Sequence, residues 1–141
     1  MAIYDAQLNN ESTRGARIYS DLDLFFGKKS SDRDISVVTD VQAVKRSIRN
    51  LVLLNTYEKP FHPEIGSNLR GMLFENISPQ MSHAISKEID LLIRNFEPRA
   101  RLVQVSTMPS IDRNAYAATI SFYVQNSPDR IIVESFLERL R

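Results

Sequence analysis

The stretch "SPQMSHAISKEIDLLIRNFEPRARLVQVSTM", Ser78–Met108, decides the fold because its hydrophobic period changes partway along. Up to Phe96 the apolar residues recur at helical spacing, and beyond Pro98 they alternate as they do in a strand. The break falls at Pro98, since a proline disfavours the helical conformation in the residue before it. The stretch therefore predicts a long helix that ends near Glu97 and leads directly into a β-sheet.

Further helical segments are predicted on the N-terminal side of this stretch. Ser78 is a good N-cap for the long helix, and Pro79 suits its first position, where a missing N–H is harmless. Asp40 is predicted to cap an earlier amphipathic helix, and a short helical turn is expected over residues 67–75. The apolar residues expected to be buried by these three segments are Val41, Val44, Ile48, Leu51 and Val52, then Leu69, Met72 or Leu73, and Phe74, then Met81, Ile85, Ile89, Leu92 and Phe96.

On the C-terminal side, strands are predicted over residues 101–108 and 115–125, joined by a loop over 109–114. Residues 130–140 fit either a helix or a strand, and their β-branched start favours a strand. The predicted class is α+β: two main helices and a short intervening helix packed on a small C-terminal antiparallel or mixed sheet. We expect an extended N-terminal arm over residues 1–39 and a single domain over 40–141.

Composition narrows the function. The chain has 141 residues, 43% of them hydrophobic, and its 18 Lys and Arg nearly balance its 17 Asp and Glu. The near-neutral charge argues against nucleic acid or an anionic membrane as a partner. There are no cysteines, so a disulfide scaffold and a thiolate metal site are both excluded. Neither a membrane-spanning run nor a signal peptide is recognisable, which predicts a soluble protein.

Enzyme motifs are absent from the sequence. Glycoside hydrolysis needs two suitably spaced carboxylates, and the candidates by residue type are Glu58, Glu64, Glu75 and Glu97, but spacing selects no pair. His62 and His83 stand apart from any zinc-ligand pattern. We therefore expect no enzymatic activity, no cofactor and no metal.

Two rigid segments are the better candidates for function. At the corner Glu97-Pro98-Arg99, the two charges flank a fixed break, and they either pair within the chain or bind another chain, since Arg suits bidentate contacts. In the loop over residues 58–66, the prolines and a glycine hold apolar side chains in place. That loop either presents a preformed surface to partners or covers the helices. The candidate residues in the loop are Phe61, Pro63 and Gly66.

Three motifs in this order carry a resemblance to a known family: "YSDLDLFF" at 19–26, "KPFHPEIGSNLRGMLFENISP" at 59–79 and "NFEPRARL" at 95–102. Together they resemble the GPW family of baseplate wedge proteins from contractile-tailed phages, which includes the TssE component of type VI secretion systems. The similarity runs from about residue 18 to the C-terminus. One departure is Tyr57, where many relatives carry glycine.

The resemblance implies a structural subunit of a virion tail baseplate that is assembled in the host cytoplasm, with a fold like the inner domain of the sheath subunit. It implies that Glu97, Pro98 and Arg99 contact the core bundle of neighbouring wedge subunits. It also implies that the protein anchors the first sheath ring, and that tail tube or hub proteins are further candidate partners.

The C-terminal strands are too few to close on themselves, so a free edge is expected. The resemblance to the inner domain of the sheath subunit implies that this edge accepts a strand from the sheath. The candidate residues there are Ile132, Val133 and Phe136, although Ile132 and Phe136 could instead belong to the core. Two alternatives for the whole protein are a lysozyme-like enzyme of the baseplate and a stand-alone peptide-binding module.

Overall fold

The computed structural model of the chain describes residues 19–28, 34–125 and 129–138. The chain divides into two compact units, Met1–Ala43 and Val44–Arg141. In the first unit, β1 (Ser20–Leu22) pairs antiparallel with β2 (Val37–Thr39). Much of the predicted arm, residues 1–18 and 29–33, lies outside the described residues, so the predicted division at residue 40 stays a prediction.

Three helices are found where the sequence predicts them: α2 (Asp40–Leu53), α3 (Leu69–Met72) and α4 (Pro79–Phe96). The start of α4 is as predicted, because the Ser78 hydroxyl accepts a hydrogen bond from the backbone N–H of Met81 at 3.1 Å and Pro79 takes the first position. The helix ends with Glu97 as its C-cap, directly before Pro98.

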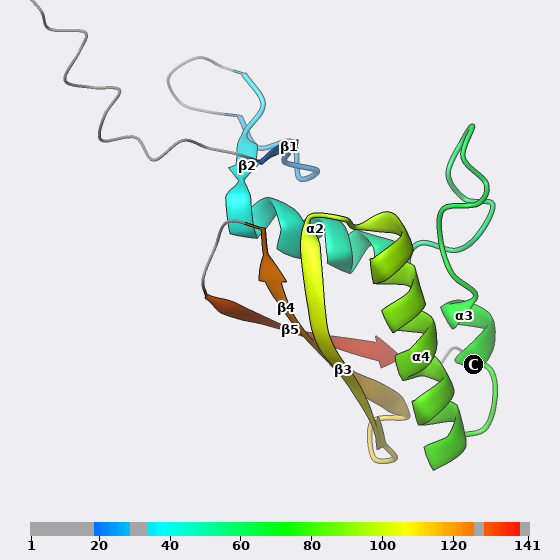
Figure 1. The fold of residues 1–141 in the computed structure, drawn as a ribbon. Coiled ribbons are helices and arrows are strands. Elements are labelled where there is room, and N and C mark those ends of the chain that lie inside the picture. The colour runs from blue at the N-terminus through cyan, green and yellow to red at the C-terminus, as the bar shows by residue number, and fades with distance from the viewer. Residues whose placement is uncertain (1–18, 29–33, 126–128, 139–141) are drawn as a thin grey trace, which may run out of the picture. The chain divides into compact units, whose positions relative to one another are not determined.

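The sheet of the second unit contains β3 (Ala100–Ser110), β4 (Ala115–Val124) and β5 (Arg130–Glu138). All neighbours are antiparallel and the order is β3-β4-β5, so β4 is central (Figure 1). An irregularity between Leu102 and Gln104 inserts Val103 into β3 and leaves its side chain about half exposed. The predicted α+β class is confirmed.

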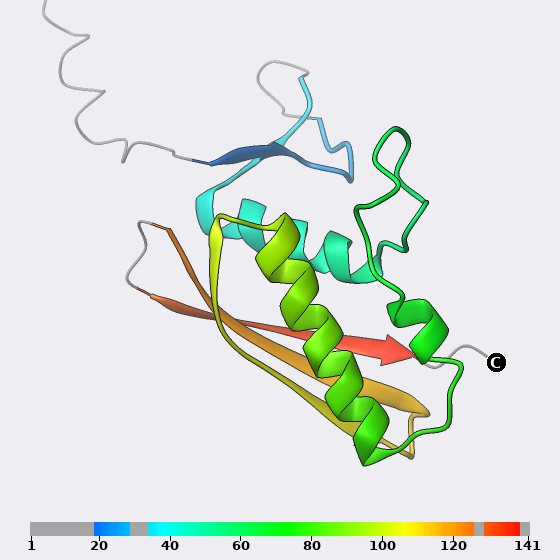
Figure 2. The same cartoon turned by 45° about the vertical axis from the view of Figure 1, so that its right-hand side comes forward.

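The core lies where the helices meet one face of this sheet. Alternate residues of β4 are buried, and the hydroxyl of buried Tyr116 accepts a hydrogen bond from the backbone N–H of Ser78 at 3.3 Å. Helix α4 runs beside β3, as Figure 2 shows. The buried apolar residues include Val44, Ile48 and Val52 of α2, Ile85, Ile89, Leu92 and Ile93 of α4, Tyr116, Ala118, Ile120, Phe122 and Val124 of β4, and Ile131 and Leu137 of β5.

One burial prediction is wrong, and one open alternative is decided. Phe74 is 56% exposed, because α3 ends at Met72 and the following turn buries Leu73 instead. On β5, the core takes Ile131 and Leu137, whereas Ile132 and Phe136 are more than half exposed. Successive side chains of a strand point to opposite faces, so the even-numbered residues of β5 lie on the face away from the core.

Candidate interaction sites

The corner between α4 and β3 is held by a buried ion pair. Arg99 donates two hydrogen bonds to the Glu97 carboxylate, from Nε to Oε1 at 2.6 Å and from Nη2 to Oε2 at 2.9 Å. The Glu97 side chain is 3% exposed and that of Arg99 is 24% exposed. This bidentate geometry is the strongest form of a carboxylate–guanidinium contact.

A third residue joins the corner from a distant part of the chain. The Ser47 hydroxyl, on α2, donates a hydrogen bond to Oε2 of Glu97. The backbone N–H of Gln125, just after β4, donates to the carbonyl of Arg99 at 3.1 Å. One carboxylate therefore links α2 to the junction of α4 and β3. Sequence reasoning missed Ser47, since nothing in its local pattern distinguishes it from any other helical serine.

These contacts set the protonation state of Glu97. Burial raises the pKa of the carboxyl, but hydrogen bonds from Arg99 and Ser47, together with the charge of Arg99, outweigh that effect and hold the pKa of Glu97 below its ordinary value. Glu97 is therefore a fixed anion at neutral pH.

The structure thus contains the intramolecular pair, one of the two predicted alternatives for the corner. Glu97 is enclosed within its own chain, whereas Pro98 is exposed. A partner could reach Pro98 and the outer part of Arg99, and such a contact stays a prediction.

The second candidate site, which we call the proline loop, comprises residues 57–66. Its base is closed by a bridge between Asn55 and Ser67, in which the Ser67 N–H donates to the carbonyl of Leu54 at 3.1 Å. Across the loop, the N–H of Tyr57 donates to the carbonyl of Pro63 at 3.0 Å. The loop is therefore folded by its own backbone hydrogen bonds.

Gly66 is essential to this closure. Its φ is +137°, and a Cβ atom built on it would lie 2.6 Å from the backbone carbonyl atoms of Asn55. Two non-glycine residues of the loop also have positive φ, Tyr57 at 70° and Phe61 at 66°.

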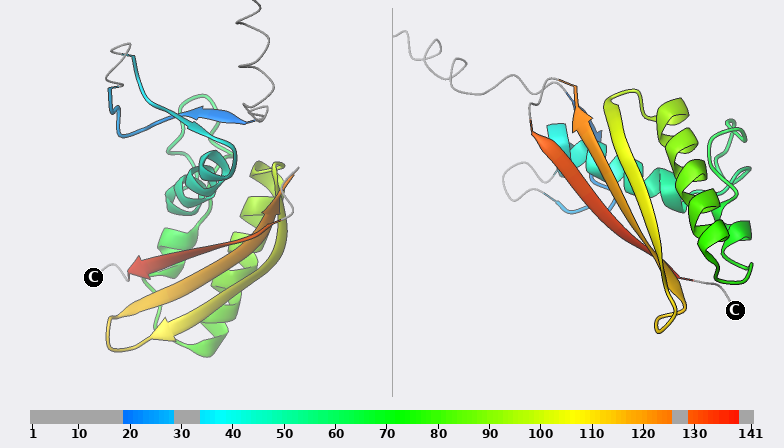
Figure 3. Two further views of the ribbon diagram at one scale, coloured as in Figure 1. Left: turned by 90° about the vertical axis from the view of Figure 1, so that its left-hand side faces the viewer. Right: turned by 60° about the horizontal axis from the view of Figure 1, so that its bottom comes forward.

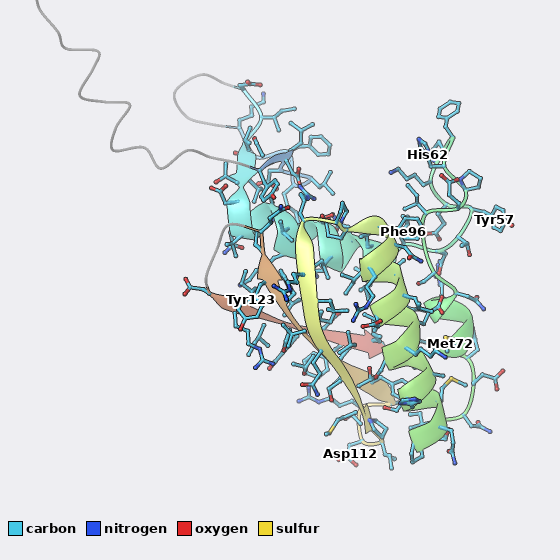
Figure 4. The ribbon with its side chains drawn as sticks, in the orientation of Figure 1. Tyr57, His62, Met72, Phe96, Asp112 and Tyr123 are labelled. Carbon is cyan, nitrogen blue, oxygen red and sulfur yellow. The ribbon has the colours of Figure 1, made fainter. Side chains whose placement is uncertain are left out.

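Side chains of the proline loop point into solvent. Phe61 is 97% exposed and Tyr57 is 85% exposed, and Figure 4 shows Tyr57 and His62 on the outer part of the loop. Pro63 is also exposed, while Gly66 is buried. For Phe61, the alternative in which the loop covers the helices is therefore wrong, because a ring so exposed covers nothing in its own chain.

The third candidate site is the outer strand β5, shown at one side of the sheet in Figure 3. Ile132 and Phe136 are exposed and Val133 is half-buried. The ring of Phe136 has the guanidinium of Arg113 at 5.4 Å from its centroid, a cation–π contact. A hollow of about 300 Å³ lies beside the end of β5, lined largely by apolar side chains: Val52, Leu53, Leu69, Leu73, Phe136 and Leu137, with Asn55, Arg70 and Glu138.

A larger hollow lies at the opposite edge of the sheet, between α4 and β3. It measures about 720 Å³ and is lined by polar residues that include Ser82, His83, Ser86, Lys87 and Asp90. The Ser82 hydroxyl donates to the backbone carbonyl of Thr107, and the Ser86 hydroxyl donates to Oγ1 of Thr107 at 2.8 Å. The edge of β3 is thus already engaged by α4.

The pKa values of two candidate carboxylates, Glu58 and Glu64, are shifted in the direction opposite to that of a catalytic acid. The pKa of Glu58 is lowered by hydrogen bonds from the backbone and side chain of Asn55, and that of Glu64 by its own backbone N–H and by His62. A glycosidase acid needs the opposite shift. In the described part of the chain, no three His, Cys, Asp or Glu residues are placed to hold a metal ion, and no helix has the length and hydropathy to span a membrane.

The fold and these surfaces define a small α+β protein with a free strand edge and exposed apolar side chains, features typical of a subunit that works inside an assembly. The chain belongs to the family of baseplate wedge protein gp25, whose family model matches residues 38–129. It is 30% identical over 115 residues to baseplate wedge protein gp25 of Enterobacteria phage T4, covering 82% of this chain and 86% of that protein. The predicted family is confirmed.

Solved structures show the same fold. A chain of the anti-feeding prophage baseplate is 26% identical, with a TM-score of 0.68 over 79% of this chain and 89% of that one. A chain of the contracted pyocin R2 baseplate is 20% identical, with a TM-score of 0.57 over 71% and 98%. A candidate tail lysozyme from Geobacter sulfurreducens is 19% identical, with a TM-score of 0.64 over 70% and 89%. The last two likenesses concern the fold alone.

Proposed function

We propose that this protein is a structural subunit of a contractile-tail baseplate that binds neighbouring wedge subunits through the Glu97-Pro98-Arg99 corner and anchors the first sheath ring through the free edge of β5. Family membership and the occurrence of a similar chain in the anti-feeding prophage baseplate support the structural role. The observation that carries the sheath contact is an open strand edge lying beside an apolar hollow.

The hydrogen-bond pattern indicates which backbone groups β5 offers. In an antiparallel ladder, successive residues point alternately toward and away from a given neighbour. The backbone N–H of Gln125 donates a hydrogen bond to the carbonyl of Arg99 in the β3–β4 register. The odd-numbered residues of β4 therefore form hydrogen bonds with β3, and the even-numbered residues form them with β5. The backbone groups of Ile132, Glu134 and Phe136 then point to the free edge, where an added strand would bond.

The hollow beside β5 adds side-chain specificity to that edge. A strand added to a sheet gains affinity from its main chain and selectivity from pockets that take alternate side chains. Leu53 and Phe136 are more than half exposed at this hollow, and an apolar side chain of the incoming strand would cover them.

The edge of β3 is a poorer acceptor. The same alternation points the backbone of Val105, Thr107 and Pro109 outward, but the carbonyl of Thr107 already accepts from Ser82 and Pro109 has no N–H. We therefore assign strand addition to β5.

At the corner, the proposed roles differ between residues. Glu97 positions the Arg99 guanidinium from within the chain, while Pro98 and the exposed part of Arg99 form the surface that meets the core bundle. The geometry is prepared before binding, so little side-chain ordering is needed on assembly.

A pair of proline substitutions tests the sheath contact. Glu134→Pro removes an outward N–H of β5 without removing a β4–β5 hydrogen bond, and Val105→Pro does the same at β3. We expect Glu134→Pro baseplates that form but carry no sheath by electron microscopy, and normal sheath with Val105→Pro. Normal extended sheath on folded Glu134→Pro baseplates would exclude the β5 edge.

A substitution at an exposed residue guards against a folding defect. Leu53→Asp places a charge in the hollow at a side chain that is 60% exposed, so the isolated protein should fold normally by circular dichroism. Loss of sheath in this variant supports the proposal, and unchanged sheath assembly contradicts the role of the hollow. Deletion of residues 129–141 removes the core residues Ile131 and Leu137, so the truncated chain must first be shown to fold by circular dichroism. A folded truncation should permit baseplates and prevent sheath polymerisation.

A further inference from the structure

The proline loop exposes two aromatic rings that its own chain does not cover. Phe61 is 97% exposed and Tyr57 is 85% exposed. Aromatic side chains carry a large apolar surface whose removal from water is favourable. Their exposure on one well-bonded loop is therefore a feature that needs a physical reason.

The backbone at both exposed aromatic residues is in an unfavourable conformation. Tyr57 and Phe61 both have left-handed φ values, which are unfavourable for bulky residues and persist where the surrounding structure imposes them. Hydrogen bonds from the N–H of Tyr57 to Pro63, at 3.0 Å, and from the N–H of His62 to Lys59, at 3.3 Å, hold the loop around these residues. The strained conformation directs the rings outward, and it buries neither of them.

We propose that Phe61 is a preformed plug that inserts into an apolar pocket of a neighbouring protein subunit in the baseplate, with Tyr57 as a second anchor. The inference rests on the proposed function, since it requires an assembled baseplate. Aromatic residues seated in desolvated pockets are the usual hot spots of protein interfaces, and a loop already held in shape loses little freedom on binding.

The charges of the loop favour a protein partner over a lipid surface. Glu58 accepts hydrogen bonds from the backbone and side chain of Asn55 and lies 3.8 Å from Arg70, and Glu64 lies 3.1 Å from His62. Binding to anionic lipid typically relies on a cluster of unpaired cations beside the apolar residues. Here two acidic residues and one lysine, Lys59, whose charge acts on Glu64, lie in the loop with the rings, so the loop carries no such cluster.

Photo-crosslinking in the assembled particle tests the location of the ring. p-Benzoylphenylalanine would replace Phe61 in one sample and Ile111 in the other, because Ile111 is also a large apolar residue, 79% exposed, on the β3–β4 loop. We expect position 61 to crosslink to one segment of one neighbouring baseplate protein, with a yield about tenfold above that of position 111. Equal or scattered crosslinks at the two positions would overturn the inference.

Substitutions at the same position separate the ring from the backbone strain. Phe61→Ala removes the ring, Phe61→Asn removes it while suiting the left-handed conformation, and Phe61→Leu keeps an apolar side chain. We expect all three isolated proteins to melt within a few degrees of the parent. Incorporation into baseplates should fall by roughly tenfold or more for Ala and Asn and should be largely retained for Leu.

If Phe61→Asn enters baseplates as well as the parent does, the plug is contradicted. The plug is also contradicted if more of the parent than of Phe61→Asn co-sediments with phosphatidylglycerol vesicles. Either result leaves the proposed function intact if the baseplates still form and carry sheath. Failure of the proposed function would appear differently, as absence of the parent protein itself from baseplates.

Discussion

The Glu-Pro-Arg corner and the proline loop are both rigid, and they are rigid for opposite purposes. At the corner, the functional groups are side chains turned inward: Glu97 is 3% exposed and bonded by Arg99 and Ser47. In the loop, the backbone supplies the internal bonds and the side chains turn outward, with Phe61 97% exposed.

The difference separates what the isolated chain needs from what an assembly needs. The buried corner should govern the stability of the monomer, because breaking it leaves a charge without its partner in a desolvated site. The exposed rings of the loop should contribute little to monomer stability, and the backbone beneath them should contribute more. Each of the following predictions tests one side of this comparison.

The largest effect is expected at the corner. Glu97→Ala leaves the Arg99 guanidinium and the Ser47 hydroxyl without their acceptor and should lower the free energy of unfolding by about 3 kcal/mol. Urea denaturation measures the change. The matched control is Asp90→Ala, which breaks the exposed Asp90–Arg94 pair on α4 and should cost about 0.5 kcal/mol or less. Similar losses in both variants would show that burial of the corner is not what makes it important.

The next effect is expected at the base of the loop. Gly66→Ala forces a left-handed residue and a Cβ atom against the backbone of Asn55, so it should cost about 2 kcal/mol or more. Gly71→Ala is the control, because its Cβ would meet only the flexible end of the Asn68 side chain. Thermal unfolding of both variants, compared with the parent, should place Gly71→Ala close to the parent.

A smaller effect is expected on the pH dependence of stability, to which the ionised Glu97 carboxylate contributes. Its pKa is lower when folded than when unfolded, so its contribution is fully present above the unfolded carboxyl pKa and is lost as the pH falls through the folded pKa. Unfolding curves from pH 7 to pH 2 should show a smaller acid-induced loss for Glu97→Gln than for the parent. Equal losses would assign the acid sensitivity to other carboxyl groups.

The smallest effect is expected at Tyr57. Glycine removes the cost of its left-handed conformation, about 1–2 kcal/mol, but adds freedom to the unfolded chain, so Tyr57→Gly should stabilise the monomer by only about 0.5 kcal/mol. A clear destabilisation in the same unfolding experiment would mean that the exposed ring supports the loop.

Much of the fold could be predicted from the sequence because its signals are local. The cap at Ser78, the stop at Pro98 and the alternation of Tyr116, Ile120 and Phe122 each depend on neighbouring residues, and the structure agrees with all of them. Local sequence did not decide which alternate residues of β5 face the core. Both Ile131 and Ile132 begin an apolar alternation, and only packing against the helices selects the first for the core.

The candidate sites depended on tertiary contacts to a greater degree. Ser47 is distant in sequence from Glu97, so its hydrogen bond could not be read from spacing. From the sequence, the loop that holds Phe61 could either cover the helices or present a surface to partners, because composition does not reveal whether a loop folds back over the helices or extends from them. The exposure of Phe61 follows from that geometry.

The engagement of the β3 edge by Ser82 has a consequence for how an assembly could grow. A subunit whose sheet can be extended at both sides could be inserted anywhere in a series of strand-linked copies. With the carbonyl of Thr107 already bonded and Pro109 lacking a donor, the β5 side is the better side for extending this sheet. Under the proposed strand addition at β5, such a subunit would start a series and would not continue one, which would give polymerisation a defined origin and a single direction.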